Sequence, residues 1–429
     1  MNLFSVDADG IRSKVRWLVV AVSLFAFASA ARAAEMPALS LDEALDLAVA
    51  QAPMIAARDA GLTAASEEVA RAASLPDPML SFGVQNLPIA GADAFSLNDD
   101  RMTMRRIGVT QSLPSRAKRE ARRDAALALE SQADASKVAS VLEVKRVAAA
   151  AWIALWAAGR ERALLDELRE QNQLAVATAK ARLSGGDGLA SDALAARAVE
   201  LELDNRIDDA DARVEEARVG LSRWIHDLAN REVASPPDFS VLPQTQSELL
   251  DHLDQQAPLL VWDARENAAD AALSMANAEK RPDWSIGAGF AKRGADASNV
   301  VWLEVGIGLP VFTANRQDRG INARRSDLQA IRAEREEARR AQSESVQRLF
   351  AQWSSQGRKA ARFSESILPL SHDRSATALA AFSGGASLDS WLNAQRDEIN
   401  ARIDYARLLG EWGRSWAELA FLVAQENAR

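Results

Sequence analysis

Cysteine is absent from the 429 residues of this chain, and histidine occurs only three times. Without cysteine there can be no disulfides, no thiolate zinc site and no lipid attached to an N-terminal cysteine. His226, His252 and His372 lie far apart in the sequence, and none belongs to a pair with ligand spacing. We therefore predict no resident metal and no cofactor, and we expect stability to come from packing alone.

Motifs of catalysis and of nucleotide binding are also missing. No Walker pattern and no Gly-x-Ser-x-Gly occurs, and Gly287-Ala288-Gly289 lacks the third glycine and the following helix of a dinucleotide loop. Carboxylates are plentiful, but they fall on helical faces where ion pairing with neighbours is the default. The net charge of −9 argues against nucleic acid, which binds to basic patches. We predict that the chain is not an enzyme and does not bind nucleic acid.

Long apolar runs are missing as well, apart from a short one near the N-terminus. Residues 17–30 follow three basic residues and are too few to span a bilayer. Ala31-Arg32-Ala33 places small residues at the −3 and −1 positions of a cleavage site, so residues 1–33 are expected to form a signal peptide; the alternative is an N-terminal membrane anchor. Removing this segment takes away four basic and two acidic groups and leaves a net charge of −11.

The sequence does contain a duplication. Four landmarks return in the same order: Gln51-Ala52-Pro53 as Gln256-Ala257-Pro258, Pro76-Asp77 as Pro282-Asp283, Leu113-Pro114 as Leu309-Pro310, and Ser184-Gly185-Gly186 as Ser383-Gly384-Gly385. The offsets between the copies are 205, 206, 196 and 199 residues. Each copy is expected to contain a helix, two strands, a very long helix, a glycine-rich turn and a returning helix. A duplicated unit this elongated favours a tube wall over an enzyme pocket.

Two pairs of strands are predicted from apolar residues that alternate with small or polar ones. They cover about residues 79–87, 104–113, 283–292 and 300–312. Alternation with a period of two gives each strand two chemically different faces. One interpretation is lipid on one side and water on the other, and the alternative is a soluble sandwich with one face on a core. Four strands cannot close a barrel, because even small barrels need about eight, so either the sheet packs on helices or several chains pool their strands.

Long helices account for most of the remaining chain. A capping box that begins at Ser40 starts a helix expected to run to about Ala73. The long helix at about 115–183 contains only one glycine and no proline, which predicts a rod of roughly 100 Å. The returning helix at about 189–228 carries a heptad seam of Leu203, Ile207, Ala210, Val214, Ala217, Leu221, Trp224 and Leu228.

The second copy repeats this plan with an interruption. Its long helix is expected at about 316–382, with a break or kink at Pro369, and its returning helix at about 388–425. The first structural repeat as a whole covers 34–228 and the second covers 248–429. A proline-containing linker, 229–247, joins them and is expected to lie at the waist of the rod.

Glycine clusters mark the turns of two helical hairpins. Gly185, Gly186 and Gly188 follow the first long helix, and Gly384 and Gly385 follow the second. Glycine ends a helix readily because it adopts a positive φ without a steric penalty. We expect these residues to form the tips of the rods.

Together these features resemble the TolC-type outer-membrane efflux family over about residues 39–422. The resemblance rests on the duplication, the strand pairs, the Leu-Pro exits into the long helices, and the tip sequences at 188–196 and 385–395. It implies a mainly α fold with β: a homotrimer in which four strands per chain form a twelve-stranded outer-membrane β-barrel on a long periplasmic α-helical barrel. It also implies a periplasmic adaptor (a membrane fusion protein), an inner-membrane pump of the resistance-nodulation-division class and outer-membrane lipid as partners, in a Gram-negative bacterium.

The sequence around the first strand narrows the resemblance. Leu75-Pro76-Asp77-Pro78, followed by residues 82–88, resembles the branch (CusC/CzcC-like) that serves heavy-metal pumps. That branch implies cargo such as copper or silver, or zinc, cobalt or cadmium. An outer-membrane duct for drugs or protein export stays open as an alternative, and so does a soluble periplasmic coiled-coil scaffold or adaptor.

Three groups of residues are expected to carry the function of such a duct. The lipid-facing residues of the barrel should be Phe82, Val84, Val301, Leu303, Val305 and Ile307. Asp192 and Asp389 follow the tips, and threefold symmetry would make each a ring of three carboxylates that attracts cations and narrows the opening. The alternative for these two residues is N-capping of the returning helices. The five tip glycines should form the turns and dock the adaptor.

Overall fold

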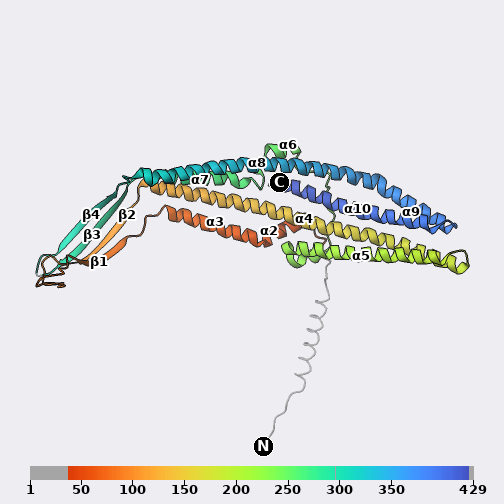
Figure 1. Ribbon diagram of the computed structural model, residues 1–429, viewed down its shortest axis with the longest axis horizontal. Helices are drawn as coiled ribbons and strands as arrows, with labels where there is room; N and C mark the ends of the chain where they lie inside the picture. The colour runs from red at the N-terminus through yellow and green to blue at the C-terminus, as the bar shows by residue number, and fades with distance from the viewer. Residues whose placement is uncertain (1–36, 295, 425–429) are drawn as a thin grey trace, which may run out of the picture.

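The computed structural model describes residues 37–294 and 296–424. The expected signal peptide, residues 1–33, lies outside the described residues. Figure 1 shows an elongated molecule with a sheet of strands at one end and helices that run to the other end, where two helical hairpins turn. A mainly helical chain with one small antiparallel sheet confirms the predicted fold class.

The first helical segment is divided in two. α2 (Leu41–Gln51) is capped by the side-chain oxygen of Ser40, and α3 (Pro53–Ala72) follows after Ala52. The prediction of one continuous helix to about Ala73 is therefore wrong. Proline has no N–H to donate and disfavours helical dihedral angles in the residue before it, so Ala52 is extended (φ −68°, ψ 117°) and a new helix begins at Pro53.

The four strands form one antiparallel sheet in the order β1-β2-β3-β4. Their bounds are β1 Met79–Gln85, β2 Met104–Leu113, β3 Asp283–Arg293 and β4 Val300–Gly308. The two copies of the duplicated unit meet at the β2–β3 pair, which leaves β1 and β4 at the edges. β4 ends before the expected residue 312 because Pro310 has no N–H to donate to a strand ladder.

The first copy continues as a pair of long antiparallel helices. α4 (Arg116–Gly185) is a single helix of 70 residues that leads away from the sheet, and α5 (Ala190–Ile225) returns beside it. Buried residues of the predicted seam, Leu203 and Ile207 among them, pack with α4 in one apolar cluster. α5 ends before the expected residue 228, since His226 takes a positive φ of 51° and begins a 3₁₀ turn, η1 (His226–Asn230).

The second copy repeats the plan with a modified long helix. α7 (Leu260–Ala278) precedes β3, and a short 3₁₀ turn, η3 (Thr313–Asn315), follows β4. The helices after η3 are α8 Gln317–Arg362, α9 Leu368–Ser383 and α10 Leu388–Ala420. A π-helical turn, η4 (Phe363–Ile367), joins α8 to α9 just before Pro369. The wider turn accommodates the ring and the missing N–H of the proline without ending the helix.

The largest core lies near the middle of the rod, where the segment between the two copies packs. α6 (Gln246–Asp251) begins at the end of this segment, and η2 (Leu253–Gln255) follows it at the start of the second copy. Phe239 is 4% exposed, and its ring centroid lies 5.7 Å from that of Trp416. Trp353 Nε1 donates to the Phe239 carbonyl at 2.8 Å, so an indole from the second copy fixes this connecting segment.

Candidate functional site

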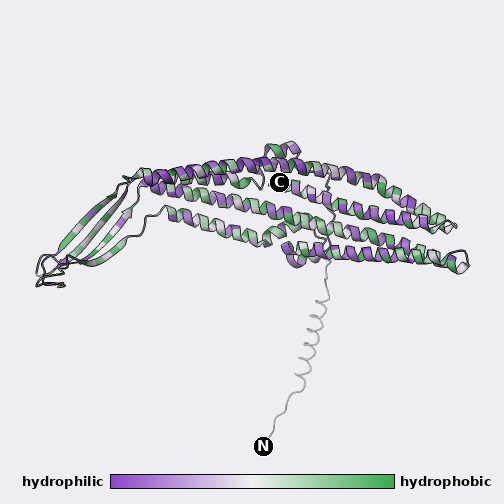
Figure 2. Cartoon of the chain, in the orientation of Figure 1, coloured by the Kyte–Doolittle hydropathy of each residue, from purple (hydrophilic) through white to green (hydrophobic). Residues whose placement is uncertain are grey.

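One face of the sheet is apolar and uncovered. Strand register aligns Phe82, Ile107, Phe290 and Val301 in one row across the four strands. Figure 2 shows hydrophobic and hydrophilic residues alternating along the strands, and no helix among the described residues lies over the sheet. The six residues expected to face lipid are all exposed: Phe82 84%, Val84 47%, Val301 82%, Leu303 75%, Val305 60% and Ile307 44%. Within the single chain, this face therefore has no core beneath it.

The opposite face of the sheet is rich in glycine and holds one large ring. The indole of Trp302 lies across Gly108, Gly287 and Gly289, where an added Cβ would come within 2.4, 3.0 and 2.6 Å of the indole. The Arg106 guanidinium lies 4.8 Å from the centre of the same indole. Sequence reasoning missed this packing, although a tryptophan among small residues at alternate positions is a usable signal for it.

The two edge strands have no partner on their outer sides. All seven residues of β1 are exposed, and in the described chain no further strand pairs with β1 or with β4. Edge strands present a row of unpaired backbone N–H and C=O groups, which favours pairing with another chain. The sheet can therefore be extended at both edges.

A buried lysine connects the sheet to the first long helix. The Lys118 side chain is 7% exposed, and its Nζ lies 2.8 Å from Asp283 Oδ2 and 3.4 Å from Glu279 Oε2. The other carboxylate oxygen of Asp283 accepts the Ser115 N–H at 3.1 Å. A carboxylate of the second copy thus holds the first turn of the long helix of the first copy.

Both hairpin tips end their long helix in the same way. Gly186 has a φ of 84°, and the N–H groups of Gly186 and the next residue bond to carbonyls three and five residues earlier. Gly385, with a φ of 106°, repeats this pattern at the second tip. This is the Schellman arrangement, in which only glycine adopts the left-handed conformation without a steric penalty.

The other three tip glycines have different roles. A Cβ at Gly188 would lie 2.9 Å from the Arg182 backbone, so this position requires close approach of the chain. Gly185 and Gly384 have φ outside the left-handed region and leave room for a Cβ. The backbone therefore requires glycine at 186, 188 and 385, but not at 185 and 384.

The two aspartates expected to narrow the opening lie in the first turns of the returning helices. Asp192 is half-buried in the first turn of α5, and Asp389 is exposed in the first turn of α10. Neither residue is the N-cap, because Leu189 occupies that position before α5 and Ser387 occupies it before α10. The N-capping alternative is therefore wrong. Both carboxylates lie where the helix dipole favours negative charge, at the end of the molecule remote from the sheet.

A buried polar layer lies in the helical bundle behind the tips. Glu398 is 0% exposed and accepts hydrogen bonds from Arg402 at 2.8 Å and from His372 at 3.0 Å. Asn172 and Gln395 are also 0% exposed. This layer separates one apolar cluster near the tips from a second cluster farther along the rod. The sequence alone does not pair His372 with Glu398, because the two residues lie on different helices.

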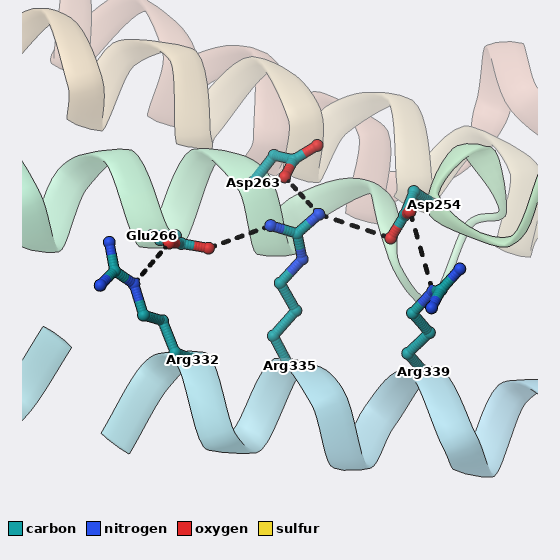
Figure 3. Close-up of polar contacts among 6 residues, drawn as sticks. All are labelled: Asp254, Asp263, Glu266, Arg332, Arg335 and Arg339. Atoms are coloured by element: carbon teal, nitrogen blue, oxygen red, sulfur yellow. Dashed lines mark hydrogen bonds and ion pairs between the residues drawn. The ribbon is translucent and has the colours of Figure 1, made fainter. Parts of the chain in front are cut away.

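An ion-pair network joins α7 to α8 (Figure 3). Arg335 lies at its centre, 2.6 Å from Asp263, 3.0 Å from Glu266 and 3.5 Å from Asp254. Glu266 also accepts a hydrogen bond from Arg332 at 2.7 Å. Hydrogen bonds from the two arginines hold the pKa of the Glu266 carboxyl below its usual value.

Two further observations concern only residues 37–294 and 296–424. No group of three or more histidine, aspartate or glutamate residues is placed there to hold a metal ion. No helix in these ranges combines the length and the hydropathy needed to cross a membrane.

Solved structures resemble this fold over most of its length. The sequence itself matches no family model and no curated protein. The outer-membrane channel OprN has a TM-score of 0.74 at 17% identity and covers 89% of this chain and 89% of its own. A membrane protein from Pseudomonas aeruginosa has a TM-score of 0.71 at 17% identity, over 90% of this chain and 93% of its own. CusC, a protein described as forming a transmembrane channel, has a TM-score of 0.65 at 15% identity, over 91% and 94%.

These similarities support, at the level of architecture, the resemblance drawn from the sequence. They do not single out the heavy-metal branch, because the TM-score of OprN (0.74) is higher than that of CusC (0.65). Identities of 17% and below establish the fold alone. The chain has the fold of these outer-membrane channel proteins.

Proposed function

We propose that this chain is the outer-membrane channel component of a tripartite efflux system, a passive duct from the periplasm to the exterior of a Gram-negative bacterium. One observation carries the proposal: a single chain joins an uncovered apolar sheet face with two open edges to a helix of 70 residues, which is about 100 Å long. The energy for transport is supplied by an inner-membrane pump, and this chain performs no catalysis.

The working form is a homotrimer. Four strands are too few to close a barrel, whereas three chains supply twelve, and closure removes the open edges of β1 and β4. The apolar face that includes Phe82 and Val305 then contacts outer-membrane lipid, and the face with Trp302 and Glu304 lines the lumen. The helices extend into the periplasm and form the wall of a tunnel.

The hairpin tips are the contact with the rest of the machine. The turns at Gly185, Gly186 and Gly188 and at Gly384 and Gly385 dock a periplasmic adaptor, which links the duct to a pump of the resistance-nodulation-division class. In the trimer, Asp192 and Asp389 each form a ring of three carboxylates at the periplasmic opening. These rings attract cations and narrow the opening.

The cargo is heavy-metal cations, such as copper and silver or zinc, cobalt and cadmium. Support for this comes from Leu75-Pro76-Asp77-Pro78 and the residues that follow, which resemble the branch that serves metal pumps. A deletion strain should become sensitive to these metals and keep its resistance to drugs. Drug sensitivity without metal sensitivity would instead assign the duct to drug export.

The channel itself is tested on the protein extracted from outer-membrane fractions in detergent. Native mass spectrometry should give the mass of three mature chains, and planar bilayers should show discrete conductance steps. A monomer that dissolves in plain buffer and forms no pore would reject the duct and favour a soluble periplasmic scaffold.

A further inference from the structure

The two hairpins of the sheet have the same register, residue for residue. The first strand of each hairpin is related by the offset between Asp77 and Asp283, which is 206, and the second by the offset between Leu113 and Leu309, which is 196. Leu80 pairs with Val109 in the first hairpin. Adding 206 to the number of Leu80 gives Ile286, and adding 196 to that of Val109 gives Val305. Ile286 and Val305 are partners in the second hairpin. The duplication is therefore retained in the backbone pairing as well as in the sequence.

The β2–β3 pair is a seam between two hairpins inside one chain. Val109 pairs with Ala288 there, and Leu113 pairs with Trp284. A closed trimer needs a second kind of seam, between β4 of one subunit and β1 of the next. Because β4 is the counterpart of β2 and β1 is the counterpart of β3, the chain contains a template for this seam.

We propose that the seam between subunits copies the β2–β3 register, so that Val305 pairs with Phe82 of the neighbouring subunit. The same offsets pair Ile307 with Leu80 and Leu303 with Val84 of that subunit. The inference rests on the proposed trimer and specifies which residues meet in it. Each edge of the sheet is thus occupied by another copy of this chain, β4 by one neighbour and β1 by the other.

The faces of the strands agree with this register. It places the exposed apolar residues of β4 beside the exposed apolar residues of β1, on the same face of the sheet. A shift of one residue would place Phe82 beside Glu304 or Gly306 and would exchange the two faces of the neighbouring strand. Shifts by an odd number of residues are therefore excluded.

Charge at the end of the strands distinguishes the remaining even shifts. Asp283, in the template seam, binds the Lys118 side chain and the Ser115 N–H at the start of α4. Its counterpart Asp77 is exposed and has no ion pair among the described residues. Arg316 and Arg319, at the start of α8, likewise have no ion pair within the described ranges.

In the proposed register, Asp77 of the neighbouring subunit lies beside the segment that leads from β4 into α8, and this segment contains Arg316 and is followed by Arg319. Pro310, which follows β4, falls opposite Asp77 of the neighbouring subunit, as Pro114 falls beside Asp283 in the template. A shift of two residues would move the carboxylate away by about 6–7 Å, since a strand rises about 3.3 Å per residue. The charges therefore favour the register without a shift.

Cysteine pairs test the register directly, because the natural chain has no thiol. Three double variants place the two cysteines opposite each other across the proposed seam: Phe82→Cys with Val305→Cys, Leu80→Cys with Ile307→Cys, and Val84→Cys with Leu303→Cys. Leu80→Cys with Val305→Cys and Val84→Cys with Val305→Cys are the shifted controls. Val109→Cys with Ala288→Cys is the reference pair within one chain. Each variant is oxidised as the detergent-solubilised trimer and run on a non-reducing denaturing gel.

The in-register pairs should lose the monomer band to covalent dimers and trimers, and the reference pair should stay at monomer mass. The shifted controls should remain monomeric on the gel, because diagonal neighbours in a sheet are about 7–8 Å apart and disulfides do not bridge Cα atoms beyond about 7 Å. Crosslinking of a shifted pair in preference to all three in-register pairs overturns the register. So does an intact trimer, by native mass spectrometry, in which none of the three pairs crosslinks. If wild-type protein forms no trimer, the proposed duct fails together with the seam.

Discussion

The guanidinium of Arg182, in the last turn of α4, lies 4.7 Å from the ring centre of Phe382 in the last turn of α9 and donates to the Phe382 carbonyl at 2.7 Å. The two residues belong to different copies of the duplicated unit, Arg182 three residues before Gly185 and Phe382 two residues before Gly384. Phe382 is 1% exposed, so its ring is a fixed surface for the cation. One arginine therefore links the two hairpin tips, in addition to the apolar cluster that packs behind them.

Replacing Arg182 with alanine should loosen the tips relative to each other. The change removes a charged hydrogen bond and a cation–π contact, together about 2–4 kcal/mol. We expect amide hydrogen exchange at residues 183–188 and 383–387 to accelerate by at least about tenfold, because about 1.4 kcal/mol corresponds to a factor of ten. Lys180→Ala is the matched control, since Lys180 is exposed and lies two residues away. Equal exchange in both variants would mean that Arg182 does not join the tips.

The tip glycines should respond to alanine according to their backbone. Gly186→Ala and Gly385→Ala place a Cβ at φ values of 84° and 106°, which costs roughly 1–2 kcal/mol each. Gly185→Ala is the matched control, because an added Cβ meets no atom within 4 Å. All three variants should still form trimers, and urea unfolding should show a loss only for the first two.

Adaptor docking is tested on the same variants by crosslinking to the adaptor and by efflux in cells. Impaired efflux in Gly185→Ala, with unchanged stability, would indicate that the adaptor contacts this glycine directly. Full efflux in all three variants would reject a docking role for the tip turns.

Charge on the apolar sheet face should block membrane insertion. Val305→Arg places a guanidinium on the proposed lipid-facing side, at a cost of about 2–4 kcal/mol near the bilayer midplane. We expect less trimer in outer-membrane fractions than for wild type. Glu304→Arg, one residue away on the opposite face, should insert normally. Equal amounts of both variants in the membrane would count against lipid contact at Val305.

Acid should weaken the contact between α7 and α8 through Glu266. Its pKa lies below the usual value of 4.5 because Arg332 and Arg335 hydrogen-bond the carboxylate. A lowered folded-state pKa means that the stabilisation is fully present above about pH 4.5 and is lost as the pH falls through the folded-state value. We expect Glu266→Gln to have a lower Tm than wild type at pH 7 and a smaller further decrease between pH 5 and 3. Glu337→Gln, at an exposed position without an ion pair in the described chain, should follow the wild-type profile.

The architecture was predictable because each element carries a strong local signal. Alternation at 283–292 marks a strand, the proline-free segment before Gly185 marks one long helix, and the Leu-Pro pairs mark the exits from the strands. The break at Ala52 was missed because the capping box at Ser40 and the apolar residues beyond it continue the helical pattern through Pro53. A proline at the first position of a new helix has the same local sequence as one inside a kinked helix.

The contacts that join the copies were not predictable from one sequence. Lys118 reaches Asp283 across 165 residues, and Arg182 reaches Phe382 across 200. No periodic pattern encodes such pairs, since each depends on how the copies are arranged in space. The duplication does predict one contact between strands, because the register of the β2–β3 pair specifies the register proposed for β4 and β1 of neighbouring subunits.

Neutralising the tip aspartates should change the ion preference of the channel. In a trimer, Asp192→Asn and Asp389→Asn each remove three carboxylates from the periplasmic opening, and with them the local attraction for cations. We expect each variant, in planar bilayers, to have a lower cation-to-anion permeability ratio and weaker block by multivalent cations added on the tip side. Asp187→Asn is the matched control, because Asp187 is exposed within the first tip turn but outside the returning helix. If Asp192→Asn and Asp389→Asn both keep the wild-type permeability ratio and block, the two aspartates only complement the helix dipole and do not control ion passage.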